Sequence, residues 1–280
     1  MFISIILSII SFWLEHQQSA GNAAPVVWHQ AEEGLSFAEA PMPLKSFLGD
    51  SRIHLIRIDP SKFRFKLLCA TENGFQKKKI RDWCEPENML AGVNAGMFHG
   101  YNDIESYQGL TNTGFTRNYE HVNNPTLNSD KACIFFNPKD SSLSAFQIAD
   151  RTCQNIQVLI KSYNTVIQGI RLFDCNQKVI WQKDQKKWSM CVMLTDKQGF
   201  VYFVHCRSPY TVHSFCQQLK TLIPEINRGI YLEGGPESSL YLNTTTQKWA
   251  LMGSYETNFW ENDSNQELWP LANVVGIVKK

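Results

Sequence analysis

The sequence lacks the patterns that mark several common classes of protein. It contains no Cys-x-x-Cys pair and no His-Glu-x-x-His segment, which argues against thioredoxin-like redox sites and zinc hydrolases. Neither a Gly-x-Gly-x-x-Gly segment nor a Walker loop is present, so the usual nucleotide-binding sites are not predicted. Charge of one sign is not in excess: 27 Lys and Arg residues against 26 Asp and Glu residues give a net charge of +1. Nucleic acid is therefore not predicted as a partner.

Long apolar runs are also scarce, and the clearest one lies at the N-terminus. Residues 2–14 are almost wholly apolar, but this run is shorter than the roughly 20 residues of a membrane-spanning helix. It has the length of the apolar region of a signal peptide, and small residues follow it. We predict a signal peptide over residues 1–24, a secreted or periplasmic protein and no stable membrane span after cleavage. The absence of Lys or Arg before the run leaves open a buried N-terminal helix or a start codon placed too late.

Composition indicates a folded chain with a substantial core. Hydrophobic residues make up 43% and charged residues 19% of the 280 residues, which excludes intrinsic disorder. Residues 25–50 contain several prolines and are predicted to be an irregular lead-in. No repeat or linker divides the remainder, so residues 51–280 are predicted to form one domain.

Strand patterns dominate this domain. Residues 52–59 and 63–69 alternate apolar and polar side chains around a turn, which predicts a hairpin, and residues 155–163 are predicted as a further strand. Residues 209–223 carry an apolar stripe at helical spacing, with Ser208 as the predicted N-cap. Consecutive strands with short connections favour an α+β fold. Its expected core is a strand-rich mixed or antiparallel sheet with two or three helices.

Eight cysteines raise the question of disulfides. Export would allow them to pair, but eight cysteines permit 105 complete pairings, so the sequence assigns none. Several lie inside apolar patterns, where cysteine commonly serves as a small buried hydrophobe.

Two glycine-containing segments stand out as candidate functional sites. They are Asn94-Ala95-Gly96-Met97-Phe98 and Glu233-Gly234-Gly235-Pro236-Glu237-Ser238-Ser239, and each follows a short apolar strand pattern. Glycines at a strand end expose backbone N–H groups and let a ligand approach the backbone closely. An ordinary turn that requires positive φ is the alternative for either segment alone.

Together the two segments resemble the phosphodiester glycosidase domain family. That family carries an Asn-Gly-Gly-Tyr/Phe-Phe turn and a later Leu-Asp-Gly-Gly-Gly/Pro-Ser-Ser segment. Here the first corresponds to residues 94–98 and the second to residues 232–239, and Gln108-Gly109-Leu110 resembles a family feature between them. The resemblance covers roughly residues 85–278. This chain departs from the family at Glu233, which stands in place of Asp, and at Ala95, which stands in place of Gly.

The resemblance implies hydrolysis of the glycosidic bond of a sugar 1-phosphodiester on an extracytoplasmic glycan or glycoconjugate. The sequence motifs predict no cofactor and no metal, although hard oxygen ligands would suit a divalent cation. Glycoside hydrolysis usually requires two carboxyl groups. We predict Glu233, Asn94 and Glu237 as catalytic residues, with Asp103 and Glu105 as further candidate carboxylates. The predicted substrate-binding residues are Gly96, Gly234, Gly235, Ser238 and Ser239, with Arg171 and Arg207 to bind the phosphate.

Two other functions fit the same residues. The first is a non-catalytic, exported glycan-binding protein on the same fold, since aromatic residues make up 12% of the chain and suit contact with sugars. The second is a secreted structural or inhibitory protein held by disulfides.

Overall fold

The computed structural model describes residues 25–99, 110–129 and 132–280. The predicted signal peptide over residues 1–24 and the candidates Asp103 and Glu105 lie outside these residues. Among the helices of the described residues, none has the length and apolar character needed to cross a membrane.

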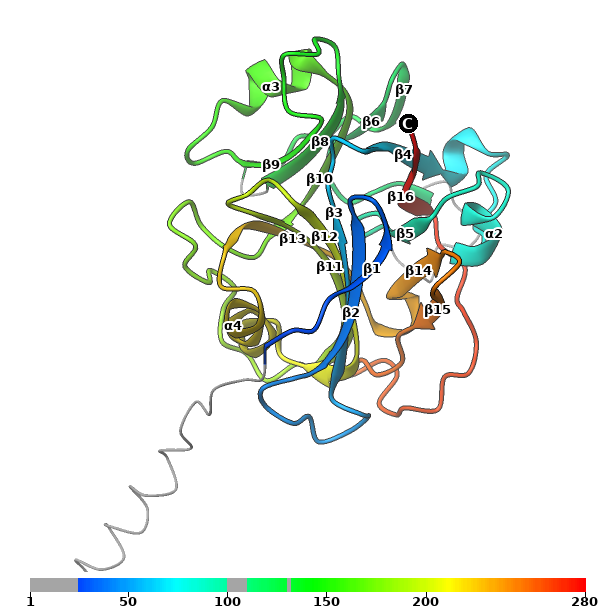
Figure 1. The fold of residues 1–280 in the computed structure, drawn as a ribbon, viewed down its shortest axis with the longest axis vertical. Coiled ribbons are helices and arrows are strands. Elements are labelled where there is room, and N and C mark those ends of the chain that lie inside the picture. Colours follow the sequence, from blue (N-terminus) through cyan, green and yellow to red (C-terminus); the bar gives the residue numbers. More distant parts are fainter. Residues whose placement is uncertain (1–24, 100–109, 130–131) are drawn as a thin grey trace, which may run out of the picture.

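Within the described residues, the larger of two sheets has eleven strands (Figure 1). Its main path runs in the order β1 (His29–Glu32), β2 (Leu35–Pro41), β3 (Arg52–Ile58), β12 (Val201–Tyr210), β11 (Trp188–Asp196), β13 (Ile226–Gly234), β10 (Tyr163–Arg171), β6 (Thr116–Asn118) and β7 (His121–Asn124). Off this path, β8 (Ala132–Pro138) pairs with β10 and with β9 (Phe146–Asp150).

The smaller sheet has five strands in the described part of the chain. Their order is β15 (Lys248–Met252), β14 (Ser239–Asn243), β5 (Ala91–Asn94), β16 (Asn273–Lys279) and β4 (Phe63–Cys69). Every strand pair recorded in the two sheets is antiparallel. The predicted strand-rich α+β fold is therefore confirmed, with the antiparallel arrangement that short connections favour.

The main hydrophobic core includes apolar side chains from both sheets. Phe65 and Leu67 of β4 and Val93 of β5 are buried together with Phe203 of β12 and Leu232 of β13. In each strand, alternate residues point to one face of the sheet. The alternation read from residues 63–69 therefore selects the side chains that enter this core.

Three α-helices cover the outer faces, counted over the described residues: α2 (Ile80–Cys84), α3 (Ile156–Ser162) and α4 (Val212–Leu222). Two short 3₁₀ turns, η1 (Ala70–Glu72) and η3 (Gly235–Glu237), complete the fold. Figure 1 shows α4 beside the larger sheet and α2 at the far side of the smaller one. The predicted apolar stripe of α4 is buried, but its N-cap is Thr211, which accepts a hydrogen bond from the Ser214 N–H. Ser208 is instead part of β12.

Three further sequence predictions are wrong in local detail. The lead-in over residues 25–50 is not irregular, because it contains β1 and β2, which extend one end of the larger sheet. The predicted hairpin over residues 52–69 does not form, because β3 and β4 enter different sheets and pair with different strands. Residues 156–162 form α3 instead of a strand, because Asn155 caps the helix by accepting from the Val158 N–H.

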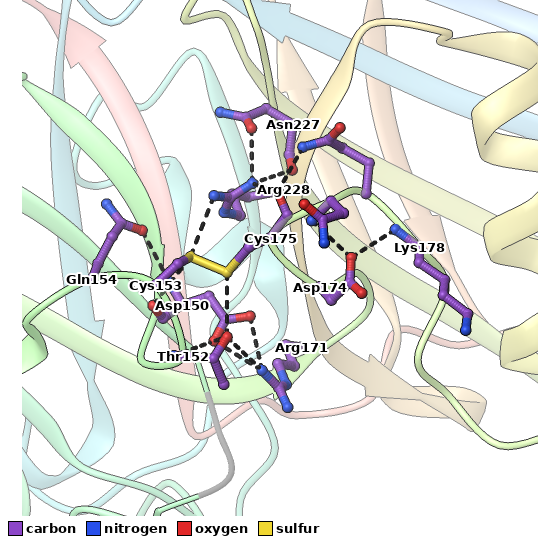
Figure 2. Close-up of a disulfide and its surroundings, with 12 residues drawn as sticks. Asp150, Thr152, Cys153, Gln154, Arg171, Asp174, Cys175, Lys178, Asn227 and Arg228 are labelled. Carbon is purple, nitrogen blue, oxygen red and sulfur yellow. Dashed lines mark hydrogen bonds and ion pairs between the residues drawn. A yellow bond between two sulfur atoms is a disulfide. The ribbon is translucent and has the colours of Figure 1, made fainter.

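A disulfide joins Cys153, which follows β9, to Cys175, which follows β10. The other six cysteines are free and buried, and burial raises the pKa of the thiol at each of them. An ion pair between Arg171 and Asp150, at 2.8 Å, lies beside the disulfide (Figure 2). The chain segment that follows β10 is therefore fixed to the β9 end by a covalent and an ionic link.

Replacing both Cys153 and Cys175 with Ser is expected to lower the free energy of unfolding by about 3 kcal/mol. The reason is that the bond closes a loop between residues 22 positions apart and so restricts the unfolded chain. Denaturant unfolding of the parent and the double variant, without reductant, measures the difference. Equal stability, or eight titratable thiols in the denatured parent, would contradict the assignment of this disulfide.

Candidate active site

The first glycine turn follows β5, a central strand of the smaller sheet. Asn94 ends this strand and is fully buried. Gly96 has a φ of +74°, and a Cβ at this position would lie 2.9 Å from Nδ2 of Asn112. Glycine is therefore required both by the backbone conformation and by the close approach of Asn112. Beyond it, the backbone N–H of Thr113 donates to the carbonyl of Met97 at 2.7 Å.

The second turn carries the chain from β13 of the larger sheet, through η3, into β14 of the smaller sheet. Gly235 has a φ of +61°, and a Cβ there would lie 2.4 Å from a carboxylate oxygen of Glu256. A Cβ on Gly234 would lie 2.3 Å from the hydroxyl of Tyr231 and 2.5 Å from the ring of Trp188. Because neither glycine has a Cβ, the side chains of Glu256, Tyr231 and Trp188 can pack directly against the backbone of this turn.

The two turns meet. Oδ1 of Asn94 accepts a hydrogen bond from the backbone N–H of Ser239 at 3.0 Å, across 145 residues of sequence. The backbone N–H of Phe98 interacts with the carboxylate of Glu233, whose Oε1 also accepts from the Gly234 N–H at 3.1 Å. The structure thus places Asn94, Glu233 and Glu237 together where the two turns meet.

Carboxyl groups in this site are difficult to ionise. Burial, then repulsion by Glu237 and Glu256, raises the pKa of Glu233 well above its usual value, against the opposing effect of two backbone N–H groups. Burial, with repulsion from Glu256, raises the pKa of Glu237 to about 7. Burial also raises the pKa of Glu256. Protonated carboxylic acid and ionised carboxylate can therefore coexist here near neutral pH.

Sequence reasoning missed two charged members of the site, Lys77 and Glu256. Lys77 lies in a run of three lysines, and its Nζ sits 4.8 Å from the centre of the Phe98 ring. Burial lowers the pKa of Lys77, while attraction to Glu237 and Glu233 opposes this shift. Glu256 reaches the site because its segment bridges to Trp188 at the start of β11. Neither residue carries a local sequence signal, because both are placed by contacts between distant segments.

Ser238 and Ser239, predicted as substrate-binding residues, use their hydroxyls within the turn. The hydroxyl of Ser238 donates to the Gly235 carbonyl at 3.0 Å, and that of Ser239 donates to the Glu237 carbonyl at 3.1 Å. Both residues are fully buried. These hydroxyls therefore hold the shape of the turn that presents Glu237.

Arg171 and Arg207, predicted to bind phosphate, both form ion pairs with the protein. Arg171 pairs with Asp150 at 2.8 Å, and Arg207 pairs with Asp263 at 2.7 Å. Arg207 also donates to the carbonyls of Asp263 and Asn265. Neither arginine is among the charged groups that shift the pKa values of Glu233 and Glu237. Lys77, in contrast, supplies positive charge beside both carboxyls.

Two buried amides near the turns have unused hydrogen-bonding atoms. Nδ2 of Asn94 has no hydrogen-bond partner among the described residues, and the same is true of both side-chain polar atoms of Asn273, where β16 begins. A buried amide without a partner is costly, and a substrate hydroxyl or an ordered water offsets that cost. The described residues contain no cluster of three or more His, Cys, Asp or Glu side chains arranged to hold a metal ion.

Comparison with known proteins identifies the family. The model of the phosphodiester glycosidase family matches residues 87–278, a range that includes both glycine turns. The chain belongs to the phosphodiester glycosidase family. No curated protein sequence matches the chain.

Solved structures agree with this membership at the level of the fold. The catalytic domain of zebrafish N-acetylglucosamine-1-phosphodiester alpha-N-acetylglucosaminidase, auto-inhibited by its pro-peptide, is similar with a TM-score of 0.62 and 12% identity, over 95% of this chain and 91% of that one. A hypothetical protein from Synechocystis gives a TM-score of 0.57 and 12% identity, over 92% and 64% of the two chains. A candidate exported protein from Burkholderia pseudomallei gives 0.52 and 9%, over 81% and 74%.

Replacing Asn94 with Ala is expected to lower the free energy of unfolding by about 1–3 kcal/mol, because the buried N–H of Ser239 loses its acceptor. Replacing the exposed Asn176 with Ala serves as the matched control and is expected to have a much smaller effect. Thermal or denaturant unfolding of both variants makes the comparison. Equal effects of the two substitutions would contradict the role of Asn94 in joining the turns.

The protein is expected to lose stability as the pH rises from about 5 to 8. The folded-state pKa of Glu237, about 7, exceeds its ordinary value of 4.5, so the folded protein holds this proton more tightly than the unfolded chain does. The resulting stabilisation is present below pH 4.5 and lost through pH 7. Glu237→Gln is expected to reduce the loss of free energy of unfolding over this pH range by up to about 3 kcal/mol. The exposed control Glu225→Gln is expected to leave the slope of stability against pH unchanged. An unaltered slope in Glu237→Gln would refute the shift.

Proposed function

We propose that this protein hydrolyses the glycosidic bond of a sugar 1-phosphodiester carried by a glycan or glycoconjugate outside the cytoplasm. The observation that carries the proposal is the junction of the two family turns, where Asn94 bonds to Ser239 and the Phe98 N–H interacts with Glu233. This junction gathers two carboxyl groups of raised pKa and a lysine in one partly buried place.

The two carboxyls fit complementary roles in this reaction. Burial and repulsion by Glu237 raise the pKa of Glu233 well above its usual value, which favours its protonated form and suits proton donation to the oxygen that departs with the phosphate. Glu237, with a pKa of about 7, is partly ionised and suits the role of base or nucleophile at the anomeric carbon. The proton released by water is thereby balanced by the proton given to the leaving phosphomonoester.

The negative charge of the phosphate requires a positively charged side chain near it. The leaving group is a phosphomonoester, which departs more readily than an alcohol and chiefly needs its negative charge stabilised. Lys77 interacts electrostatically with Glu233 and Glu237, so within the described site it is the positive charge that we assign to the phosphate. Nδ2 of Asn94 is buried beside this site and has no hydrogen-bond partner among the described residues.

Export accords with two features of the chain. The apolar run of residues 2–14 has the length of a signal-peptide core, and the disulfide between Cys153 and Cys175 is of a kind that persists in oxidising compartments. The similar Burkholderia pseudomallei protein is also a candidate exported protein.

Purified protein lacking residues 1–24 is expected to release free sugar from the methyl diester of N-acetylglucosamine 1-phosphate, which is a sugar 1-phosphodiester. Glu233→Gln removes the acidic proton while keeping the shape of the side chain, and is expected to lower kcat at least about 100-fold. The control Glu225→Gln changes an exposed carboxylate that pairs with Lys197 and is expected to retain full activity. Release of sugar is followed by chromatography.

Equal turnover by the parent and Glu233→Gln would exclude Glu233 from the reaction. A folded parent that releases no sugar from this or other sugar 1-phosphodiesters, yet binds them, would favour the non-catalytic glycan-binding protein.

A further inference from the structure

The loop that connects β2 to β3 exposes large apolar side chains. It spans residues 42–51, and we call it the Phe47 loop. The side chain of Phe47 is 60% exposed and that of Leu44 is 52% exposed. Figure 1 shows this loop in blue at the lower end of the molecule and α3 at the upper end. Single exposed apolar residues are common, but two large ones on one loop form a patch that suits a contact.

Hydrogen bonds hold the Phe47 loop in one shape. The Leu44 N–H donates to Oε1 of Gln218 on α4 at 2.8 Å, and the Tyr210 hydroxyl donates to the Leu44 carbonyl at 2.8 Å. The Ser46 hydroxyl donates to a backbone carbonyl of β12 at 2.8 Å. The loop is therefore fixed to β12 and α4 while Leu44 and Phe47 stay exposed. Little conformational freedom is lost when a loop of this kind binds a partner.

Positive charge borders the apolar side chains. Nζ of Lys187 lies 4.7 Å from the centre of the Phe47 ring. Lys45, on the loop itself, and Lys186, next to Lys187, are both exposed. The patch therefore combines an apolar tip with three ammonium groups.

Two carboxyl groups near these lysines are directed back toward the protein. Asp50 accepts hydrogen bonds from the Arg52 N–H at 3.0 Å and from the Ser208 hydroxyl at 3.2 Å. Glu256 packs against Gly235 of the catalytic turn, and burial raises its pKa. These orientations leave the lysines to set the charge that the patch presents.

The patch adjoins the candidate active site. The rings of Phe47 and Tyr255 meet edge to face, with their centres 5.4 Å apart. Glu256 follows Tyr255 directly and reaches the catalytic turn at Gly235. Phe259, which is 49% exposed, lies four residues beyond Tyr255. A partner bound to the Phe47 loop would therefore lie beside the segment that packs on the catalytic turn.

The chemistry of the patch favours a membrane over a protein as its partner. A stable protein interface buries roughly 1,200–2,000 Å², and its centre is poor in lysine. Here a few apolar side chains stand among lysines. That combination suits the surface of an anionic bilayer, where apolar side chains enter the boundary of the acyl chains and ammonium groups contact lipid phosphates.

We propose that the Phe47 loop docks the protein on an anionic lipid bilayer. Phe47 and Leu44 insert between the lipid headgroups, and Lys45 and Lys187 lie against the lipid phosphates. The proposal goes beyond the proposed hydrolysis and does not depend on it, because docking requires no reaction. It places the candidate active site at a lipid surface, where sugar phosphodiesters carried by lipids are in reach.

Cosedimentation with vesicles tests the proposal. Protein lacking residues 1–24 is expected to bind vesicles of equal parts phosphatidylcholine and phosphatidylglycerol, and to bind vesicles of phosphatidylcholine alone much more weakly. Phe47→Ser is expected to lower the partition constant for the mixed vesicles about tenfold, and Lys45→Gln about fivefold. The matched control Val158→Ser changes an apolar side chain on α3 that is 55% exposed, and is expected to leave binding unchanged.

No binding by the parent, equal binding to the two kinds of vesicle, or equal binding by parent and Phe47→Ser would overturn the proposal. An equal loss in Phe47→Ser and Val158→Ser would do the same. If thermal unfolding shows that Phe47→Ser is unstable, Lys45→Gln decides, and unchanged binding by that variant overturns the proposal.

Sedimentation equilibrium without vesicles tests a second copy of the chain as the occupant of the patch. The parent and Phe47→Ser are both expected to be monomers. A dimer of the parent that Phe47→Ser abolishes would assign the loop to self-association and overturn its role in docking to lipid.

Discussion

The hydrogen bond from the Ser239 N–H to Oδ1 of Asn94 is the contact on which the candidate site depends. It forms where the chain leaves the larger sheet and enters the smaller one, and it joins strands β5 and β14 at their ends. The site is therefore built at a junction between two sheets. The buried backbone N–H and C=O groups of the turn that connects the sheets need hydrogen-bond partners there. Buried serine hydroxyls and positive-φ glycines satisfy that requirement, and Glu233 and Glu237 occupy the same short turn.

Burial at this junction accounts for the chemistry that the site supports. Three carboxyl groups, Glu233, Glu237 and Glu256, lie close enough to repel one another, with Lys77 as the neighbouring positive charge that acts on two of them. Removing carboxyls from water raises their pKa values, and repulsion within the group adds to that effect. Such an arrangement opposes folding at neutral pH, and carboxyl groups with shifted pKa values are typical of functional sites.

Sequence reasoning succeeded where the signal was local or carried by paired motifs. Alternation over residues 63–69 and the stripe of α4 predicted correct elements, because burial of one face produces those patterns directly. The two glycine turns were predicted as one site on the strength of their resemblance to a family. The hairpin over residues 52–69 was predicted wrongly, because a turn signal does not determine whether two strands share a sheet. Lys77 and Glu256 were missed because only the fold of distant segments brings them to the turns.

Hydrolysis of a sugar 1-phosphodiester in water enriched in ¹⁸O tests the central claim most directly. In the proposed reaction, water attacks the anomeric carbon, and the new oxygen is therefore placed on the sugar. Mass spectrometry of the two products is therefore predicted to find ¹⁸O in the free sugar and none in the phosphomonoester. Finding ¹⁸O in the phosphomonoester would show that the P–O bond breaks, and would contradict the assignment of this site to glycosidic bond cleavage.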